Sequence, residues 1–374
     1  MRKGIAFFYL IIIVAGAILY GSYKVPAVQE KLAFLTEEYF SEENIYSDVE
    51  SIANRLDEEI LRGSDSFVIY LKDMAPSELD GINDSLDGVY GRGLSYQQIG
   101  EIGSRYIKVQ IATERTINYY AMDAYVHGST IPADQPKAKE LYEAISVIIK
   151  TQIKDDMSDY EKELALHDYL VKNCRYSETV NEDEKSDIYR AYGALVKGDA
   201  VCNGYAEAMQ VLLHCVNIES EFVEGYGKNT AGEWIEHAWN LVCLDGNWYH
   251  LDTTWDDPAP DQENVVIHPY FNVTDDILDK NHKWEKQDYP NADSMEENYY
   301  KKQNQYFSTL EEYQQAAYEN IVDGTGVRYE GVVEKYQEDE ENMQFIFEGN
   351  EKYNSISWQT YVIGSYTVLV INVE

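Results

Sequence analysis

A cysteine, a histidine and an aspartate occur in the order typical of thiol-dependent acyl transfer. Cys202 directly precedes a helical pattern from Tyr205 to Val216, so we expect it at or just before the start of a helix. Unpaired backbone N–H groups and the positive end of the helix dipole stabilise a thiolate there. A thiolate is the form of cysteine that attacks a carbonyl carbon, and the same N–H groups could hold the resulting oxyanion.

The histidine and the aspartate lie on two predicted strands joined by a tight turn. Asp245-Gly246 separates these strands and is a strong hairpin dipeptide. With a two-residue turn, Asp252 lies opposite Trp239, and His237 lies on the same face within reach of the carboxylate. A three-residue turn would place the two groups on opposite faces, so this prediction depends on a turn of even length.

The three residue types suffice for nucleophilic catalysis at a carbonyl carbon. His237 would accept the proton of Cys202 and later donate it to a leaving amine, while Asp252 would fix the ring tautomer and stabilise its protonated form. A free cysteine is often just a core residue, so its position alone does not establish a nucleophile. The three positions together predict a Cys-His-Asp triad.

The other cysteines and histidines lack the spacing of a metal site. The cysteines, which include no Cys-x-x-Cys pair, are Cys174, Cys202, Cys215 and Cys243. The remaining histidines are His127, His167, His214, His250, His268 and His282. We expect His167 to be a packed histidine and Asp256 to be solvated or to cap a helix, and we predict no metal and no cofactor. Disulfides are permitted but not required.

Helical and strand patterns divide the folded part of the chain into three segments. Capping boxes at residues 47–50 and 309–312 each open a helix that is followed by strands. We expect an α+β domain over 30–131, ended by a proline-containing stretch, and the domain with the triad over 132–300. A C-terminal α+β domain over 301–374 would be a distant repeat of the first.

The N-terminal segment, residues 1–29, predicts a membrane location. Arg2 and Lys3 precede an uncharged run, Gly4 to Tyr23, that is long enough to cross a bilayer. Basic residues before such a run keep the N terminus inside, so the rest of the chain would lie outside. Val25-Pro26-Ala27 is a weak cleavage site, so we favour an uncleaved signal anchor over a removed signal peptide.

Composition excludes several other classes of protein. Apolar residues make up 44% and charged residues 26%, which is ordinary for a globular chain and argues against disorder. Asp and Glu total 67 and Lys and Arg total 30, which gives a formal net charge of −37. This charge repels phosphate backbones, so we predict no nucleic-acid partner.

The triad and its surrounding motifs resemble the transglutaminase-like superfamily, a group of papain-related thiol enzymes with many secreted or membrane-anchored bacterial members. The resemblance covers about residues 137–300. Its motifs are Ala191-Tyr192-Gly193-Ala194-Leu195, Val201-Cys202-Asn203-Gly204-Tyr205-Ala206, His237-Ala238-Trp239-Asn240 and Leu251-Asp252-Thr253-Thr254-Trp255. It implies a nucleophile at the N terminus of a helix packed on an antiparallel sheet, with catalytic roles for Cys202, His237 and Asp252.

The resemblance also implies a second donor to the oxyanion. Tyr176 and Tyr192 are candidates for it, although each is more often a packed aromatic residue, and Trp239 is a candidate for support of the site. Asn203 replaces the glutamine that bacterial relatives often carry, but this position is not part of the triad.

The function implied is acyl transfer or hydrolysis of amide bonds through a Cys202 thioester, outside the cell membrane. We favour hydrolysis, as in a cysteine protease, over cross-linking, and expect extracellular or cell-envelope proteins and peptides as substrates. The alternative, from a different class, is a non-catalytic, surface-anchored binding or envelope-assembly module, which the flanking domains and the acidity would fit.

Overall fold

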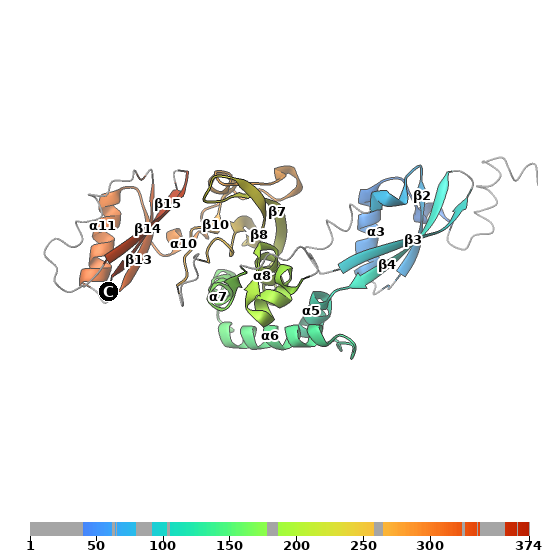
Figure 1. The fold of residues 1–374 in the computed structure, drawn as a ribbon, viewed down its shortest axis with the longest axis horizontal. Helices are drawn as coiled ribbons and strands as arrows, with labels where there is room; N and C mark the ends of the chain where they lie inside the picture. Colours follow the sequence, from blue (N-terminus) through green and yellow to red (C-terminus); the bar gives the residue numbers. More distant parts are fainter. Residues whose placement is uncertain are drawn as a thin grey trace, which may run out of the picture. The chain divides into compact units, whose positions relative to one another are not determined.

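The computed structural model describes most of the chain after residue 39. The described residues are 40–61, 64, 66–79, 92–102, 105–177, 186–257, 265–323, 326–334, 336, 356–364 and 366–373. The chain divides into two compact units, Met1–Tyr119 and Tyr120–Glu374. Both units contain helices and sheets (Figure 1), so the predicted α+β class is confirmed.

The first unit is a four-stranded sheet with one long helix. Its elements are η1 (Glu42–Asn44), β1 (Ile45–Tyr46), α3 (Val49–Leu61), β2 (Ser66–Lys72), η2 (Pro76–Leu79), β3 (Arg92–Ile102) and β4 (Tyr106–Arg115). The strand order is β1-β2-β4-β3. β1 is parallel to β2, and the other neighbours are antiparallel. Ile52 and Leu56, one helical turn apart, are fully buried in a cluster with Ile69 and Val109 of the sheet.

The N-terminal cap of α3 differs from the expected one. The carboxylate of Asp48 accepts a hydrogen bond of 2.8 Å from the backbone N–H of Ser51. The capping box predicted at residues 47–50 is therefore wrong, and Asp48 caps the first turn in place of Ser47. The physical reason is that an aspartate next to the first turn satisfies a free N–H group and also interacts favourably with the helix dipole.

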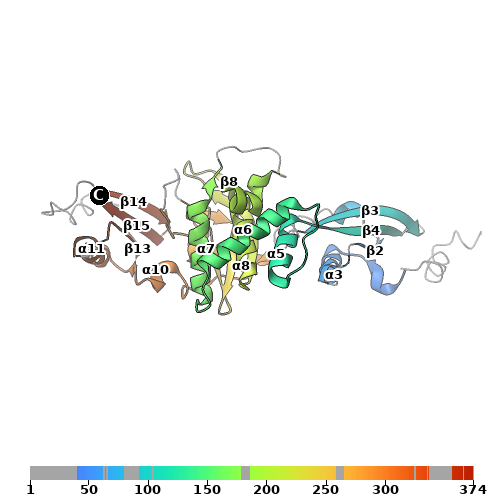
Figure 2. The ribbon, with the colours of Figure 1, turned by 90° about the horizontal axis from the view of Figure 1, so that it is seen from below.

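Helices precede the central sheet of the second unit. They are α5 (Ile117–His127), α6 (Pro136–Gln152), α7 (Asp159–Asn173) and α8 (Cys202–Cys215). α7 begins with a capping box in which Ser158 and Glu161 satisfy each other's backbone N–H groups. α6 and α8 both pack against α7 (Figure 2). Between α7 and α8 lie the short elements β5 (Arg175–Tyr176), η3 (Asp187–Tyr189), η4 (Gly193–Lys197) and β6 (Asp199–Ala200).

The central sheet is antiparallel throughout, and α8 packs on it (Figure 1). Its strands are β7 (Ser220–Lys228), β8 (Trp234–Leu244), β9 (Asn247–Leu251), β10 (Phe271–Val273) and β11 (His282–Lys283), in the order β10-β9-β8-β7-β11. β8 and β9 form the expected hairpin, with Leu244 paired with Asn247. Asp245 and Gly246 have φ values of 50° and 81°, as a two-residue turn of this hand requires. The predicted even-length turn is confirmed.

The C-terminal sheet repeats the topology of the first unit. Short elements lead to it: α9 (Asp275–Leu278), η5 (Lys286–Asp288) and α10 (Tyr299–Lys302). Its own elements are β12 (Tyr306–Phe307), α11 (Leu310–Tyr318), η6 (Glu319–Asp323), β13 (Arg328–Glu334), β14 (Ile356–Ile363) and β15 (Tyr366–Val373). The order β12-β13-β15-β14, with β12 parallel to β13, matches β1-β2-β4-β3. α11 carries the predicted capping box, Thr309 with Glu312. The same topology fits the predicted repeat, whereas a common origin stays a prediction.

The central and C-terminal sheets share one hydrophobic core. A single buried cluster contains Trp239 and Leu241 of β8 together with Val332 of β13 and Val368 of β15. The sequence led us to separate residues 132–300 from 301–374, whereas the second compact unit includes both. The first division also lies between residues 119 and 120, inside α5, and not at residue 131.

The predicted membrane anchor, residues 1–29, lies outside the described residues. Within the described part of the chain, no helix combines the length and the apolar character needed to cross a bilayer.

Candidate active site

Cys202 is the first residue of α8. Val201 is the N-cap residue, in extended conformation, and the cysteine is buried with 8% of its surface exposed. Gly204 lets this turn pack tightly, because a Cβ atom there would lie 2.5 Å from the backbone oxygen of Ile188. The first N–H groups of a helix have no intrahelical partner, so the thiol lies where an anion is stabilised.

His237 and Asp252 form a short, buried hydrogen bond. Nε2 of His237, on β8, lies 2.7 Å from Oδ2 of Asp252, which follows the last residue of β9. The other carboxylate oxygen, Oδ1, accepts the backbone N–H groups of Thr254 and Trp255 at 3.1 and 3.2 Å. The carboxylate is therefore fixed by the backbone and directed at the ring.

The Cys202 thiol lies near the His237 ring and interacts with it electrostatically, while its Sγ lies 3.6 Å from Oδ1 of Asn203. Because Asp252 engages Nε2, Nδ1 is the nitrogen that remains for the sulfur. Burial alone would lower the pKa of His237, but the charge of Asp252 and the contact with Cys202 raise it to about 10. A ring that stays protonated at neutral pH favours a thiolate–imidazolium pair.

A second histidine, which the sequence did not predict, supports the carboxylate. Nε2 of His282, on β11, lies 3.0 Å from Oδ2 of Asp252. Burial lowers the pKa of His282 to about 4, so the ring is neutral near pH 7 and can donate one N–H to the carboxylate. Burial opposes ionisation of Asp252, yet the charge and hydrogen bonds of His237 and His282 hold its pKa well below the usual range.

β7 lies between the two histidines, and glycine occupies both facing positions. Gly225 pairs with His237, and Gly227 pairs with His282. A Cβ atom on Gly227 would lie 2.6 Å from the Trp255 ring, so only glycine lets this indole cover the strand. No motif around His282 singles it out in the sequence. Once β11 is paired with β7, however, Gly225 and Gly227 lie on the sheet face that carries His237 and His282.

Trp239 is a structural support of the imidazole. Its ring is stacked on that of His237, with centroids 5.9 Å apart and planes 22° apart. Its indole N–H donates to Nδ1 of His250 at 3.0 Å, and Nε2 of His250 lies 2.9 Å from Asp275. The N–H group is thus committed to this buried chain and does not face the thiol.

The two tyrosine candidates lie in different surroundings. Tyr176, on β5, is half exposed, and burial, together with the nearby charges of Cys202 and Asp252, raises its pKa to about 12. The hydroxyl of Tyr192 instead donates to Glu140 of α6. The structure therefore brings Tyr176 near the triad, whereas the hydroxyl of Tyr192 holds α6 in place.

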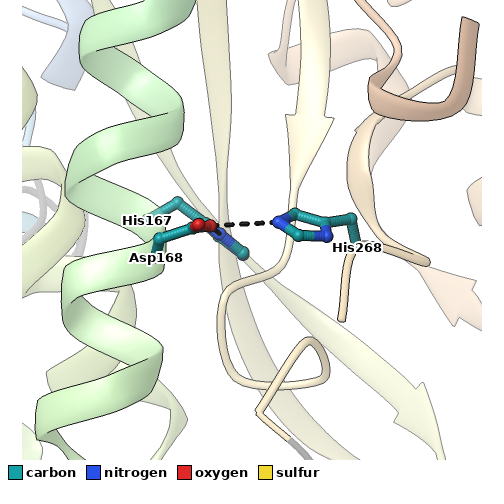
Figure 3. Close-up of side chains that lie close together, drawn as sticks. All are labelled: His167, Asp168 and His268. Atoms are coloured by element: carbon teal, nitrogen blue, oxygen red, sulfur yellow. Dashed lines mark hydrogen bonds and ion pairs between the residues drawn. The ribbon is translucent and has the colours of Figure 1, made fainter. Parts of the chain in front are cut away.

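Two groups of described residues bring histidine and carboxylate ligand atoms close enough to share a cation. One consists of His237, Asp252 and His282 in the site itself, and the other of His167, Asp168 and His268 (Figure 3). In the first group the carboxylate is engaged by two imidazoles and two backbone N–H groups, an arrangement that serves to orient a base.

Comparisons with known proteins identify the same region. Residues 148–253 match the family model of the transglutaminase-like superfamily. Kyphoscoliosis peptidase of Mus musculus is 23% identical over 119 residues, which are 30% of this chain and 18% of that protein. The human protein of that name is 23% identical over 133 residues, 33% of this chain and 20% of that protein. The chain thus matches no more than a fifth of the length of these curated relatives.

Solved structures with partial similarity include two bacterial proteins. A cysteine protease candidate from Cytophaga hutchinsonii has 17% identity and a TM-score of 0.25, covering 44% of this chain and 64% of that chain. The periplasmic domain of TgpA from Pseudomonas aeruginosa has 15% identity and a TM-score of 0.23, covering 46% of this chain and 66% of that chain.

Proposed function

We propose that this chain is a cysteine-based acyl-transfer enzyme. The premise is that its central part, residues 148–253, belongs to the transglutaminase-like superfamily. One observation supports this most directly. Nε2 of the buried His237 ring lies 2.7 Å from the Asp252 carboxylate, and the Cys202 thiol, at the start of α8, lies near the same ring. This is the arrangement in which a base activates a nucleophile and is itself oriented by an acid.

The acylation step uses groups that these residues supply. Sγ of Cys202 bonds to the carbonyl carbon of an amide, and the free N–H groups at the start of α8 stabilise the negative oxygen. The C–N bond then breaks, and the His237 imidazolium gives its proton to the leaving amine. Tyr176, the half-exposed hydroxyl near the triad, is the proposed second donor to the oxyanion.

In the second step His237 would take a proton from water or from an amine as that group bonds to the thioester carbon. The C–S bond then breaks and the Cys202 thiolate is restored beside the protonated ring. We favour water, and therefore hydrolysis of peptide bonds, because the curated relatives that match this region are named peptidases. The proposed location is extracytoplasmic, from the N-terminal apolar run, and the proposed substrates are extracellular or cell-envelope proteins and peptides.

Alkylation of the full chain with iodoacetamide, mapped by peptide mass spectrometry, tests the proposal. Burial raises the pKa of Cys174 and of Cys215 to about 12, so these thiols are internal controls. We expect Cys202 to react at least 10-fold faster than either control at pH 7, because the thiolate is the reactive form. Equal rates at the three cysteines in a folded sample would contradict the proposal.

A non-catalytic binding module is the alternative, and the low exposure of Cys202 favours it, because a catalytic thiol must meet its substrate. Cys202→Ala separates the two functions. If the variant keeps the cellular phenotype that deletion of residues 132–300 abolishes, the domain acts by binding. If the variant behaves as the deletion does, acyl transfer is the function.

A further inference from the structure

A second polar cluster lies apart from the triad, between α7 and the segment that leads into β10. His167 and Asp168 are neighbours on α7, and His268 faces them from that segment (Figure 3). Oδ1 of Asp168 lies 3.1 Å from Nδ1 of His167 and 3.0 Å from Nε2 of His268. One carboxylate oxygen and one nitrogen of each ring therefore lie within 4.8 Å of one another.

The remaining nitrogen of each ring has its own carboxylate partner. Nε2 of His167 lies 3.2 Å from Oδ2 of Asp256, and Nδ1 of His268 lies 2.9 Å from Oε1 of Glu330. The sequence favours a solvated or helix-capping Asp256, whereas the structure buries it fully. Its second oxygen accepts the backbone N–H of Tyr270, which takes the place of water. Histidines that bind a metal usually have such a carboxylate behind them, which orients the ring.

Packing fixes both rings in this orientation. His268 stacks on Tyr299 with centroids 3.6 Å apart and planes 7° apart, and His167 meets the edge of Phe271 at 5.0 Å. Both histidines are buried, whereas 29% of the Asp168 side chain is exposed. The cluster is thus a rigid set of ligand atoms with one side open to solvent.

We propose that His167, Asp168 and His268 bind a divalent transition-metal ion of the zinc type. Bonds of about 2.0–2.2 Å to a tetrahedral ion place neighbouring ligand atoms roughly 3.3–3.6 Å apart, a few tenths of an ångström more than the 3.1 and 3.0 Å between Asp168 and the two rings. Water would complete the coordination on the exposed side, where Lys172 lies 3.8 Å from the other oxygen of Asp168. Two imidazoles and one carboxylate suit zinc and its neighbours better than calcium or magnesium.

The proposed role of the ion is structural. Its ligands come from α7 and from the segment before β10, and its outer partner Glu330 comes from β13 of the C-terminal sheet. A bound ion would therefore join three parts of the second unit. The proposal does not depend on the thiol chemistry, because the hydrogen bonds that define the cluster join its residues to one another, to Asp256 and to Glu330.

Metal binding is tested with the full chain carrying Cys202→Ala, so that the thiol contributes no ligand. The probes are Zn²⁺ in calorimetry and Co²⁺ in visible absorption, after treatment with a chelator. We expect one ion per chain and a thermal midpoint that rises with Zn²⁺ concentration. A chain that binds no ion, with no shift of the midpoint, would overturn the proposal.

Matched substitutions locate the ion. His268→Gln should weaken Zn²⁺ binding by more than 10-fold, and Glu330→Gln, which keeps the shape of the outer partner, should weaken it by about 10- to 100-fold. His282→Gln, at an equally buried histidine of the triad group, is the control and should leave binding unchanged. Circular dichroism of each metal-free variant verifies folding. Binding that survives His268→Gln and Glu330→Gln but is lost in His282→Gln would overturn the assignment.

Discussion

The His237 ring lies between the Asp252 carboxylate and the Cys202 thiol, and their effects on its pKa determine its protonation. Its pKa is about 10 in the folded chain and 6.5 for a free side chain, because Asp252 and Cys202 outweigh the effect of burial. Folding thus favours the protonated ring. The resulting stabilisation is complete below pH 6.5 and is lost as pH rises through about 10.

This pH dependence can be measured by comparison with His237→Gln. Between pH 6.5 and 10, the free energy of unfolding of the unmodified chain should fall relative to that of the variant, by on the order of 1 kcal/mol for each unit of pKa shift. Urea denaturation of both chains at the two pH values gives the difference. A constant difference would show that His237 is not protonated in the folded chain.

His282 is a positioning residue whose contribution should appear in kcat. His282→Phe removes the second imidazole donor to Asp252, and a hydrogen bond to a charged group contributes about 1.5–3 kcal/mol. We expect kcat for peptide hydrolysis to fall about 10- to 100-fold with KM nearly unchanged. His282→Asn, which keeps an N–H donor, should recover part of the loss. If His282→Phe retains full kcat, the contact has no part in orienting the triad.

The residues differ in how far the sequence could predict them. Cys202, His237 and Asp252 follow from local patterns, because a helix start and a hairpin determine where their side chains lie. His282 could not be found in that way, since β11 pairs with β7 and no turn joins the two strands. The sequence favours a solvated or helix-capping role for Asp256, because acidic clusters usually have one, and it does not reveal the contacts with His167 and with the backbone of Tyr270 that accompany its burial.

At the scale of elements, β7 determines how closely the aromatic rings approach the site. Gly227→Ala would drive a methyl group into the Trp255 ring, which packs against His237 with centroids 5.1 Å apart. Overpacking of this kind typically costs about 1–3 kcal/mol. We expect a lower thermal midpoint and a reduced alkylation rate at Cys202.

Gly100→Ala is the control for this substitution. Gly100 is also a strand glycine, on β3 of the first unit, and an added Cβ atom would meet Lys108 at an ordinary 3.7 Å. It should leave both measurements within error. If the two substitutions have equal effects, the close approach at Gly227 has no special importance.

The hairpin of β8 and β9 shows why one element could be predicted in register. Asp245-Gly246 adopts the positive φ values that a two-residue turn needs, so the pairing of every residue from Asn240 to Leu251 follows. The ladder ends at Leu251, however. Asp252 is positioned by a turn in which its own carboxylate accepts backbone N–H groups, a local interaction that strand periodicity does not describe.

At the scale of the whole molecule, the C-terminal sheet completes the core of the central sheet. Removal of residues 301–374 would expose the buried cluster around Trp239, so this chain should unfold without cooperativity and lose selective alkylation of Cys202. A chain that begins at Thr116, before α5, should keep both properties, because the first unit is compact by itself. Cooperative thermal unfolding of a chain ending at residue 300 would contradict this prediction.

The sequence predicts the order of helices and strands within each end of the chain, because that order depends on neighbouring residues. The paired capping boxes and strand runs indicated that the two ends of the chain resemble each other, and their sheets do have one topology. The shared core was not predictable, because the nearly continuous apolar run of β15 indicates burial on both faces but does not show which neighbour covers the second face.

Because of this shared core, the surroundings of the Cys202 thiol depend on the last strands of the chain. A ribosome that stalls before β13 releases a chain with the cysteine, the imidazole and the acid all present, yet without the partner that holds Trp239 against the ring. Such a fragment should expose Trp239 and hold the imidazole less firmly, so we expect the complete site to form only after the final strands have been made.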